Sequence, residues 1–202
     1  MFPNSSIPVI GVTGPTGAGK STIARQLASL GCAVIDGDVL ARAITQPGSP
    51  TLEILAERFG EDTLDADGNL NRALLAERAF CSEESRLAMN RITHPAITAL
   101  AMKQAAGLPP ATQAIALDAA ALLESGLMPF IDHLVLIEAP EELRLQRIMA
   151  RDGISEQAAM QRIAAQRDIL YAPPAGLGHT ILKSVESEMH PHELSQIMER
   201  LI

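Results

Sequence analysis

Eight consecutive residues near the start of the chain have the types and the spacing that bind the phosphates of a nucleoside triphosphate. They read Gly14-Pro-Thr-Gly-Ala-Gly-Lys-Ser21 and match G-x-x-x-x-G-K-[ST] at every fixed position. Glycines let such a loop curl so that backbone N–H groups point inward, and the next helix adds partial positive charge from its N-terminus. We expect ATP to bind through Gly14, Thr16, Gly17, Ala18, Gly19, Lys20, Ser21 and Thr22.

Three side chains of this loop have separate expected roles. Lys20 reaches the terminal phosphates, the Ser21 hydroxyl binds Mg²⁺, and Thr22 contacts the α-phosphate side. The alternative is that the glycines only make a tight turn. The motif lies between an apolar strand expected at 7–13 and a helix expected after residue 21, and this context favours the phosphate-binding interpretation.

Two aspartates follow a second expected strand at 32–36. The alternation of side chains along a strand predicts that Asp36 and Asp38 share a face, next to the phosphates of a βαβ site. A GTPase should also contain a guanine-reading N-K-x-D segment, which is absent from the sequence, and the D-x-x-G match at 65–68 is expected to be a turn. A GTPase is therefore disfavoured.

Five segments, in order, resemble those of dephospho-coenzyme A kinases, and together they cover roughly 9–166. Asp36-Gly-Asp-Val-Leu-Ala-Arg42 resembles D-x-D-x-x-A-R, and His94-Pro-Ala-Ile97 resembles H-P-x-I. Residues 118–127 are similar to D-x-P-L-L-x-E-S-G-L, Arg147-Ile-Met-Ala-Arg-Asp152 looks like the lid, and Ile163-Ala-Ala-Gln166 also fits.

The sequence departs from this family at three places. Gly37 stands where the family usually has Ala, and Ala120 replaces the usual Pro. The closing A-D-x-V-I-x-N segment is represented only by residues 178–184.

The resemblance implies transfer of the ATP γ-phosphoryl group to the ribose 3′-hydroxyl of dephospho-coenzyme A, with Mg²⁺ as the metal. Asp38 is the candidate base, because a carboxylate within hydrogen-bond reach can orient the hydroxyl and accept its proton. The alternative is that Asp38 holds a Mg²⁺-bound water. Lys20, Arg147 and Arg151 are expected to stabilise the charge of the transferring group.

Arg147 and Arg151 share one face of an expected helix at i, i+4. Their alternative role is as exposed residues paired with neighbouring acidic side chains. For Arg144 we expect that exposed arrangement, whereas for Arg151 we expect the lid role.

Four residues are expected at the acceptor site through the resemblance: Asp36, Arg42, His94 and Glu124. His94 fits equally well near the start of a helix that has Pro95 in its first turn. Asp118, at the end of an apolar strand, could hold a Mg²⁺-bound water, with a buried structural carboxylate as the alternative.

The expected fold is α/β, a P-loop NTPase with a parallel five-stranded sheet flanked by helices. The phosphate-binding core is expected to comprise 7–41, 93–140 and 168–202, with further strands at 114–118, 133–137 and 180–182. A helical insertion at 42–92 should close over the acceptor, and 141–167 should form a lid.

The composition of the chain limits the classes of molecule that it is expected to bind. The 202-residue chain has a net charge of -8 and only 2% aromatic residues, which disfavours nucleic-acid binding, so we expect the small molecules ATP and dephospho-coenzyme A as partners. With no signal peptide or membrane span in the sequence, the expected location is the cytoplasm. An oligomer is compatible with the sequence. The alternative functions are another small-molecule or nucleotide kinase of this fold, or a catalytically silent nucleotide-binding regulator.

Overall fold

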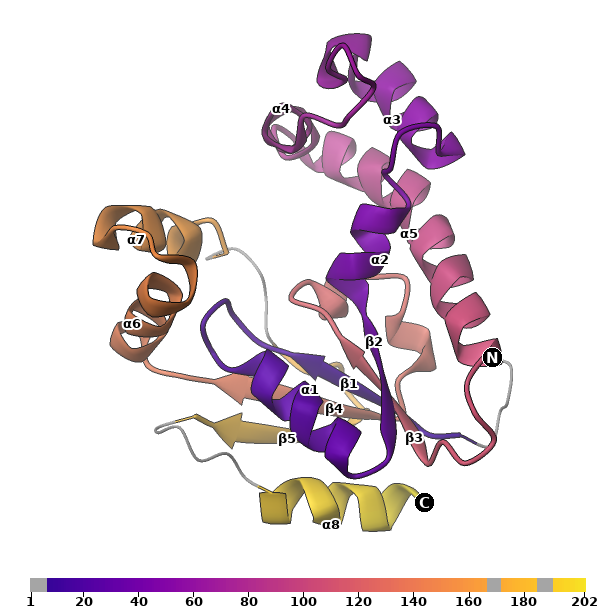
Figure 1. Ribbon diagram of the computed structural model, residues 1–202, viewed down its shortest axis with the longest axis vertical. Coiled ribbons are helices and arrows are strands. Elements are labelled where there is room, and N and C mark those ends of the chain that lie inside the picture. Colours follow the sequence, from indigo (N-terminus) through magenta and orange to yellow (C-terminus); the bar gives the residue numbers. More distant parts are fainter. Residues whose placement is uncertain (1–6, 167–171, 185–190) are drawn as a thin grey trace.

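A five-stranded parallel sheet forms the centre of the computed structural model, which describes residues 7–166, 172–184 and 191–202 (Figure 1). The strand order is β2-β3-β1-β4-β5, and every neighbouring pair is parallel. The strands are β1 (Val9–Thr13), β2 (Cys32–Asp36), β3 (Ala114–Asp118), β4 (His133–Glu138) and β5 (Gly178–Lys183). The sheet confirms the expected α/β class, including its weaker fifth strand.

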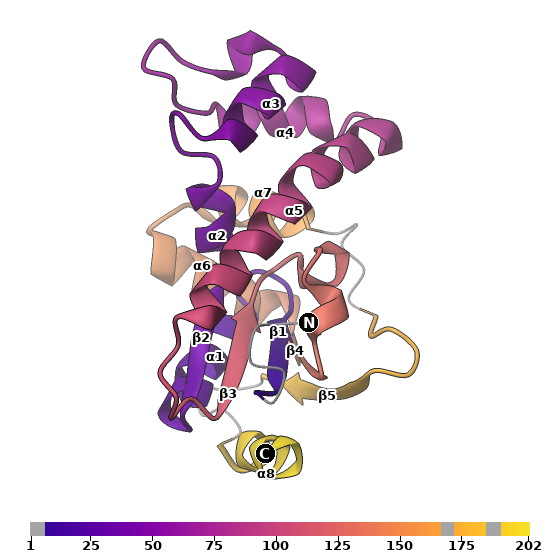
Figure 2. The same ribbon diagram turned by 90° about the vertical axis from the view of Figure 1, so that its right-hand side faces the viewer.

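Helices cover both faces of this sheet (Figures 1 and 2). On one face, α1 (Lys20–Ser29) and α8 (Pro191–Leu201) contribute apolar side chains such as Leu27 and Leu194 to the core. On the other face, α5 (Glu83–Ala106) packs through Ala101 and Ala105. Strand β1 is buried along its whole length, because both of its faces meet these two layers.

The helical insertion stands beyond the ends of β2 and β3 and has a small core of its own (Figure 1). Its helices are α2 (Gly37–Ala43), α3 (Pro50–Phe59), α4 (Arg72–Ala79) and the first half of α5. Ser49 caps α3 by accepting a hydrogen bond from the Leu52 amide, and Pro50 occupies the first turn, as expected from the sequence. The core of the insertion is formed by Leu55, Phe59, Leu75, Ala79 and Ala88.

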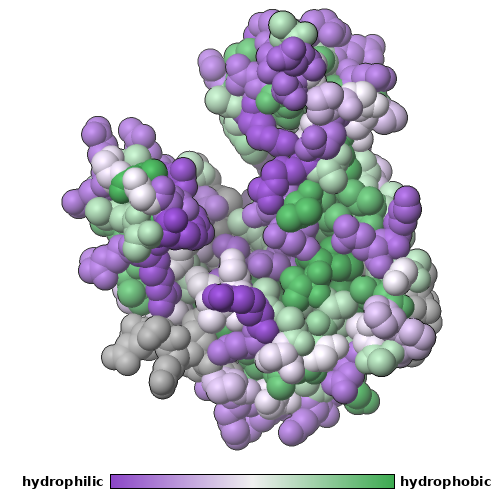
Figure 3. All heavy atoms as spheres, in the orientation of Figure 1, coloured by the Kyte–Doolittle hydropathy of each residue, from purple (hydrophilic) through white to green (hydrophobic). Residues whose placement is uncertain are grey.

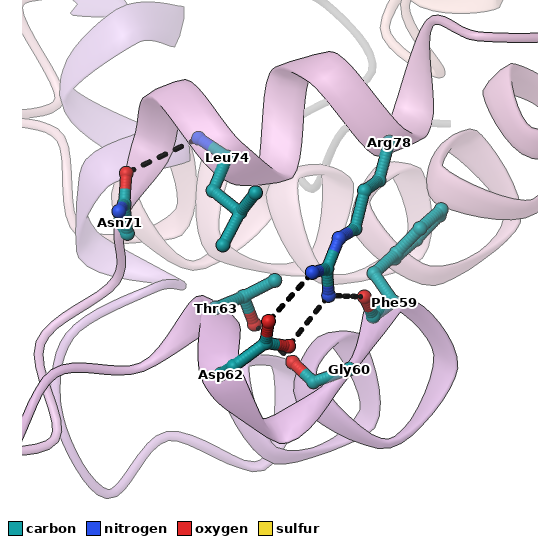
Figure 4. A network of polar contacts seen from close by, with 7 residues as sticks. All are labelled: Phe59, Gly60, Asp62, Thr63, Asn71, Leu74 and Arg78. Atoms are coloured by element: carbon teal, nitrogen blue, oxygen red, sulfur yellow. Dashed lines mark hydrogen bonds and ion pairs between the residues drawn. The ribbon is translucent and has the colours of Figure 1, made fainter.

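Polar contacts join α3 to α4 at the far end of the insertion (Figure 4). The Arg78 guanidinium donates to both carboxylate oxygens of Asp62, each at 2.6 Å, and to the carbonyl oxygen of Phe59 at 2.6 Å. Asn71 caps α4 through the Leu74 amide. One arginine therefore binds the carbonyl at the end of α3 and the short 3₁₀ turn that follows it, Glu61–Thr63.

The D-x-x-G match at 65–68 is a surface turn, as expected. The Asp65 carboxylate accepts hydrogen bonds from the amides of Asp67 and Asn69, at 2.9 and 2.8 Å. A short antiparallel bridge between Leu64 and Leu70 closes the turn. This turn lies in the helical insertion, whereas a nucleotide switch would follow a strand of the sheet.

Helix α5 is longer than the sequence suggested, and it crosses the boundary expected between 92 and 93. It begins after its cap, Ser82, so the expectation of a helix start near His94 is wrong. Pro95 lies inside the helix and cannot donate to the carbonyl of Arg91. Both residues are exposed, so water can bind that carbonyl in place of an amide.

The region expected to form a lid, called the lid for that expected role, contains α6 (Glu141–Asp152) and α7 (Glu156–Ala164), joined by a short turn. Gly153, with φ of +63°, ends α6, and Ser155 caps α7 through the Ala158 amide. Ile148, Ala159 and Ile163 hold the two helices together in a separate apolar cluster. In Figure 1 the lid lies beside the loop between β1 and α1, across from the helical insertion.

Within the described residues, no helix is both long enough and apolar enough to cross a membrane.

The separate core of the insertion makes its stability testable. Leu55 is fully buried and its neighbour Ile54 is 49% exposed. We expect Leu55→Ala to lower the free energy of unfolding by about 2–5 kcal/mol, because it leaves a cavity. Ile54→Ala is the matched control and should change it by no more than about 0.5 kcal/mol in urea titrations. Equal effects of the two variants would show that this cluster does not stabilise the fold.

Candidate active site

The loop from Gly14 to Ser21 connects β1 to α1 and has the shape of a phosphate cradle. Gly14, Gly17 and Gly19 have φ of 148°, 78° and 111°, which side-chain-bearing residues rarely adopt. A Cβ at Gly14 would lie 2.4 Å from the Ile137 carbonyl oxygen, so this position also needs glycine for space. The Lys20 ammonium donates to the carbonyl oxygens of Gly14 at 2.8 Å and Pro15 at 3.4 Å and so spans the loop.

A pocket of about 250 Å³ opens over this loop. It is lined by Thr16, Gly17, Gly19, Lys20, Ser21, Thr22, Arg25, Arg147 and Arg151. The structure therefore brings most of the residues expected to bind nucleotide together with the two lid arginines. Gly14 and Ala18 belong to the loop without lining the pocket, since Gly14 packs on β4 and Ala18 is buried.

The lid arginines are held in different ways. Arg147 donates to the carbonyl oxygen of Ala18 at 3.2 Å and to the Ser184 hydroxyl at 2.9 Å. Arg151 lines the pocket and also pairs with Asp152 at 2.8 Å, which is the ion pairing with an acidic neighbour considered from the sequence. Arg25, which the sequence analysis missed, donates to the Thr22 hydroxyl at 3.1 Å. Its spacing from Ser21, one helical turn, was the available signal.

Arg144 does not have the exposed arrangement expected for it. Its Nε donates to the carbonyl oxygen of Thr16 at 2.9 Å, at the tip of the phosphate loop. A Cβ at Gly17 would lie 2.7 Å from the Arg144 carbonyl oxygen, so α6 approaches the loop closely. Helical periodicity alone could not reveal this contact, because it joins segments 128 residues apart.

Three carboxylates gather where β2 and β3 end beside the loop. Asp36 and Asp118 are paired in the register of the two strands. Asp38 lies in the first turn of α2, so the argument from strand alternation was wrong about its position. Asp36 instead caps α2, and its Oδ1 accepts from the amides of Asp38 at 2.8 Å and Val39 at 3.0 Å.

Gly37, a departure from the family pattern, allows α2 to start against the segment that follows β3. A Cβ at this position would lie 2.8 Å from the Ala119 side chain. The small residue therefore lets Asp38 approach the end of β3 closely.

Burial and charge interactions shift the pKa values of these carboxylates and of the neighbouring Lys20. Burial raises the pKa of Asp118 to about 6, the charges of Asp36 and Asp38 add to the shift, and the charge of Lys20 opposes it. Burial and the charge of Asp36 also raise the pKa of Asp38, while Lys20 and Arg42 oppose that shift. Burial lowers the pKa of Lys20, against the attraction of Asp118 and Asp38. Lys20 is thus coupled electrostatically to both aspartates.

A second cavity, of about 290 Å³, lies between the helical insertion and the segment after β3. Its wall includes Asp38, His94 and Glu124, which the sequence placed at the acceptor site. Asp36 and Arg42, which were also placed there, lie outside its lining. Figure 3 shows the surface hollowed between the lid and the insertion, above the phosphate loop.

Two further arginines line this second cavity, which we name the acceptor cavity for its expected role, and no sequence signal pointed to them. Arg72 donates to the Thr45 hydroxyl at 2.8 Å, and Arg86 pairs with Glu124 at 3.5 Å. Leu55, Leu70, Leu75, Met89 and Ile97 provide an apolar part of the same wall.

A third pocket, of about 540 Å³, lies on the other side of the phosphate loop. It is lined by Pro15, Leu136, Ile137, Glu138, Ala139, Pro140, Lys183 and Ser184. Although the closing segment diverges from the family pattern, it still forms β5 and one wall of this pocket.

Comparisons with known proteins agree with this geometry. Residues 8–169 match the family model described as dephospho-CoA kinase. The dephospho-CoA kinase of Syntrophotalea carbinolica is 46% identical over 159 residues, which cover 78% of this chain and 75% of that protein. That of Corynebacterium diphtheriae is 43% identical over 163 residues, covering 78% of this chain and 80% of the relative.

Solved structures are similar over nearly the whole chain. The crystal structure of TT1252 from Thermus thermophilus has a TM-score of 0.73 and 27% identity, covering 98% of this chain and 97% of that one. Dephospho-CoA kinase from Campylobacter jejuni has a TM-score of 0.54 and 26% identity, covering 98% of both chains. From the family model and these relatives together, it follows that the chain belongs to the dephospho-CoA kinase family.

Proposed function

We propose that this protein transfers the γ-phosphoryl group of ATP to the ribose 3′-hydroxyl of dephospho-CoA, giving CoA and ADP. One observation beyond family membership carries the proposal. Asp38 lines the acceptor cavity and is also within electrostatic reach of Lys20 in the phosphate loop. A hydroxyl bound in the cavity could therefore meet a phosphoryl group bound by the loop at this carboxylate.

Asp38 would act as the base. Its raised pKa suits proton transfer better than an ordinary carboxyl group does, because a stronger base takes the hydroxyl proton more readily as the new O–P bond forms. The proton leaves the ribose oxygen for the Asp38 carboxylate while the bond between the γ-phosphorus and the ADP oxygen breaks.

Positive charge around the loop would stabilise the transferring group. Lys20, Arg147 and Arg151 line one pocket over the loop, where they would contribute positive charge near the terminal phosphates. Arg25 adds a fourth cation at the end of the pocket nearest Thr22.

The oxygen ligands available fit Mg²⁺. Within the described residues no group of three or more acidic, His or Cys side chains forms a complete metal site, and Mg²⁺ at kinase sites is ordinarily bound by one or two protein oxygens together with phosphates. Burial, together with the charges of Asp36 and Asp38, raises the pKa of Asp118, and a bound cation would oppose that shift by stabilising the carboxylate. Ser21 and Asp118 would hold the ion, which supplies charge neutralisation for the phosphates.

The acceptor cavity fits the chemistry of dephospho-CoA. Arg72 and Arg86 offer cations for the pyrophosphate, and the apolar wall suits the pantetheine arm. The third pocket, behind Pro15, would take the ATP nucleoside. Movement of the helical insertion and the lid over these ligands would exclude the water that otherwise hydrolyses ATP.

A coupled assay of ADP release tests the reaction. With ATP and Mg²⁺ present, we expect dephospho-CoA to stimulate release strongly, whereas adenosine and pantetheine should stimulate it little because each lacks part of the acceptor. Stimulation by an unrelated alcohol alone would indicate another kinase of this fold. No stimulation by any acceptor would indicate a nucleotide-binding regulator and overturn the proposal.

Asp38→Asn tests the base. We expect turnover to fall by roughly 10²-fold to 10⁴-fold, because the amide cannot accept the proton. The Kd for ATP, measured by calorimetry, should stay within about threefold, well below the tenfold that corresponds to 1.4 kcal/mol. Asp67→Asn, in an exposed turn, makes the same chemical change and should leave turnover intact. Near-normal turnover in Asp38→Asn would remove the base role.

The pH profile tests the charge coupling. Because Asp38 acts when deprotonated and its pKa is raised, kcat/KM should fall on the acid side at a higher pH than an ordinary carboxyl group would give. Asp36→Asn removes a charge that raises this pKa but keeps an oxygen to cap α2, so the acid limb should move to lower pH. A limb that stays in place, or moves upward, would contradict the assignment.

A further inference from the structure

Thr16, at the tip of the phosphate loop, has both of its main-chain polar groups bound by side chains of the lid region. Its carbonyl oxygen accepts from Arg144 Nε at 2.9 Å, and its amide donates to Gln166 Oε1 at 2.6 Å. The two partners stand 128 and 150 residues later in the sequence. The main chain of Thr16 is therefore held on both sides, at its N–H and at its carbonyl oxygen, by a different part of the fold, and we call this pair of contacts the clamp.

The amide that Gln166 binds is distinct from those available to phosphate. Within the described part of the chain, the amides of Gly17, Gly19, Lys20 and Ser21 make no hydrogen bond, and the last two open helix α1. These amides can bind an anion. Gln166 thus occupies a loop amide that precedes this set, and it does not compete with nucleotide for one of them.

The surrounding contacts show that the clamp belongs to a built interface. Arg147 binds the carbonyl oxygens of Gly17 and Ala18, at 3.4 and 3.2 Å, so the lid region contacts three consecutive loop residues. Gly17 lacks the Cβ that would collide with the Arg144 backbone. Ile163, one turn before Gln166, is buried in the lid cluster and fixes the end of α7.

We propose that Gln166 is a positioning residue for ATP: by holding the Thr16 amide, it keeps the loop in its phosphate-binding shape when the lid is docked. Three glycines with positive φ make the free loop costly to order, and the clamp offsets part of that cost. Because coupling is reciprocal, ATP binding in turn favours the docked lid. The inference rests on the proposed binding of ATP by this loop.

Gln166→Met tests it, because Met keeps a similar shape and lacks the carbonyl oxygen. Gln161→Met is the control, since Gln161 is an exposed glutamine on α7, five residues before Gln166. Loss of one neutral hydrogen bond should weaken the ATP Kd about fivefold in calorimetry. The control, and the Kd of Gln166→Met for dephospho-CoA, should stay within about twofold of the wild type, since only the ATP site loses an interaction.

Amide exchange followed by NMR provides the second measurement. In the wild-type chain ATP should slow exchange of the Thr16 amide, and Gln166→Met should speed this exchange about fivefold while Gln161→Met leaves it unchanged. An unchanged or tighter ATP Kd in Gln166→Met, or a Thr16 amide indifferent to both ATP and the substitution, would overturn the inference. Failure of the wild-type chain to bind ATP would overturn the proposed function as well.

Discussion

A buried lysine that must keep its charge is the constraint on which the site depends. Burial disfavours the ammonium of Lys20, and Asp118, at the end of β3, and Asp38, in the first turn of α2, counteract that cost. The strand order β2-β3-β1 makes this compensation possible, because it brings the carboxyl ends of three neighbouring strands together. The phosphate loop, the three carboxylates and the acceptor cavity consequently lie together at the carboxyl ends of these strands.

The helical insertion and the lid, which lie on either side of these strand ends, have independent cores. The helical insertion packs around Leu55 and Phe59, and the lid packs around Ile148, while the sheet keeps its own clusters. A region with its own core can shift as a unit without exposing the apolar interior of its neighbour. This division places the phosphate loop, which the sheet carries, between two regions that can move separately.

Local patterns predicted what depends on local sequence. The strands, the phosphate loop, the cap at Ser49 and the turn at Asp65 followed from short motifs. The family resemblance pointed to His94 and Glu124, which line the second cavity, and to Asp36 and Arg42, which do not. The position of Asp38 was misjudged because β2 ends at Asp36, two residues earlier than strand alternation required. Arg144 and Arg72 were missed or misplaced because their roles depend on contacts between distant segments, which no window of sequence records.

Helix α5 runs from the helical insertion to the sheet. Near its end it packs on the sheet through Ala101 and Ala105, and near its start it packs in the core of the insertion through Ala88. Between these two packing sites, Pro95 removes one backbone hydrogen bond of the helix. Pro95 follows His94, which lines the acceptor cavity. A helix that lacks one backbone hydrogen bond bends more easily at that position than along its intact turns. Bending of α5 is thereby favoured next to His94, so movement of this helix would change the width of the acceptor cavity.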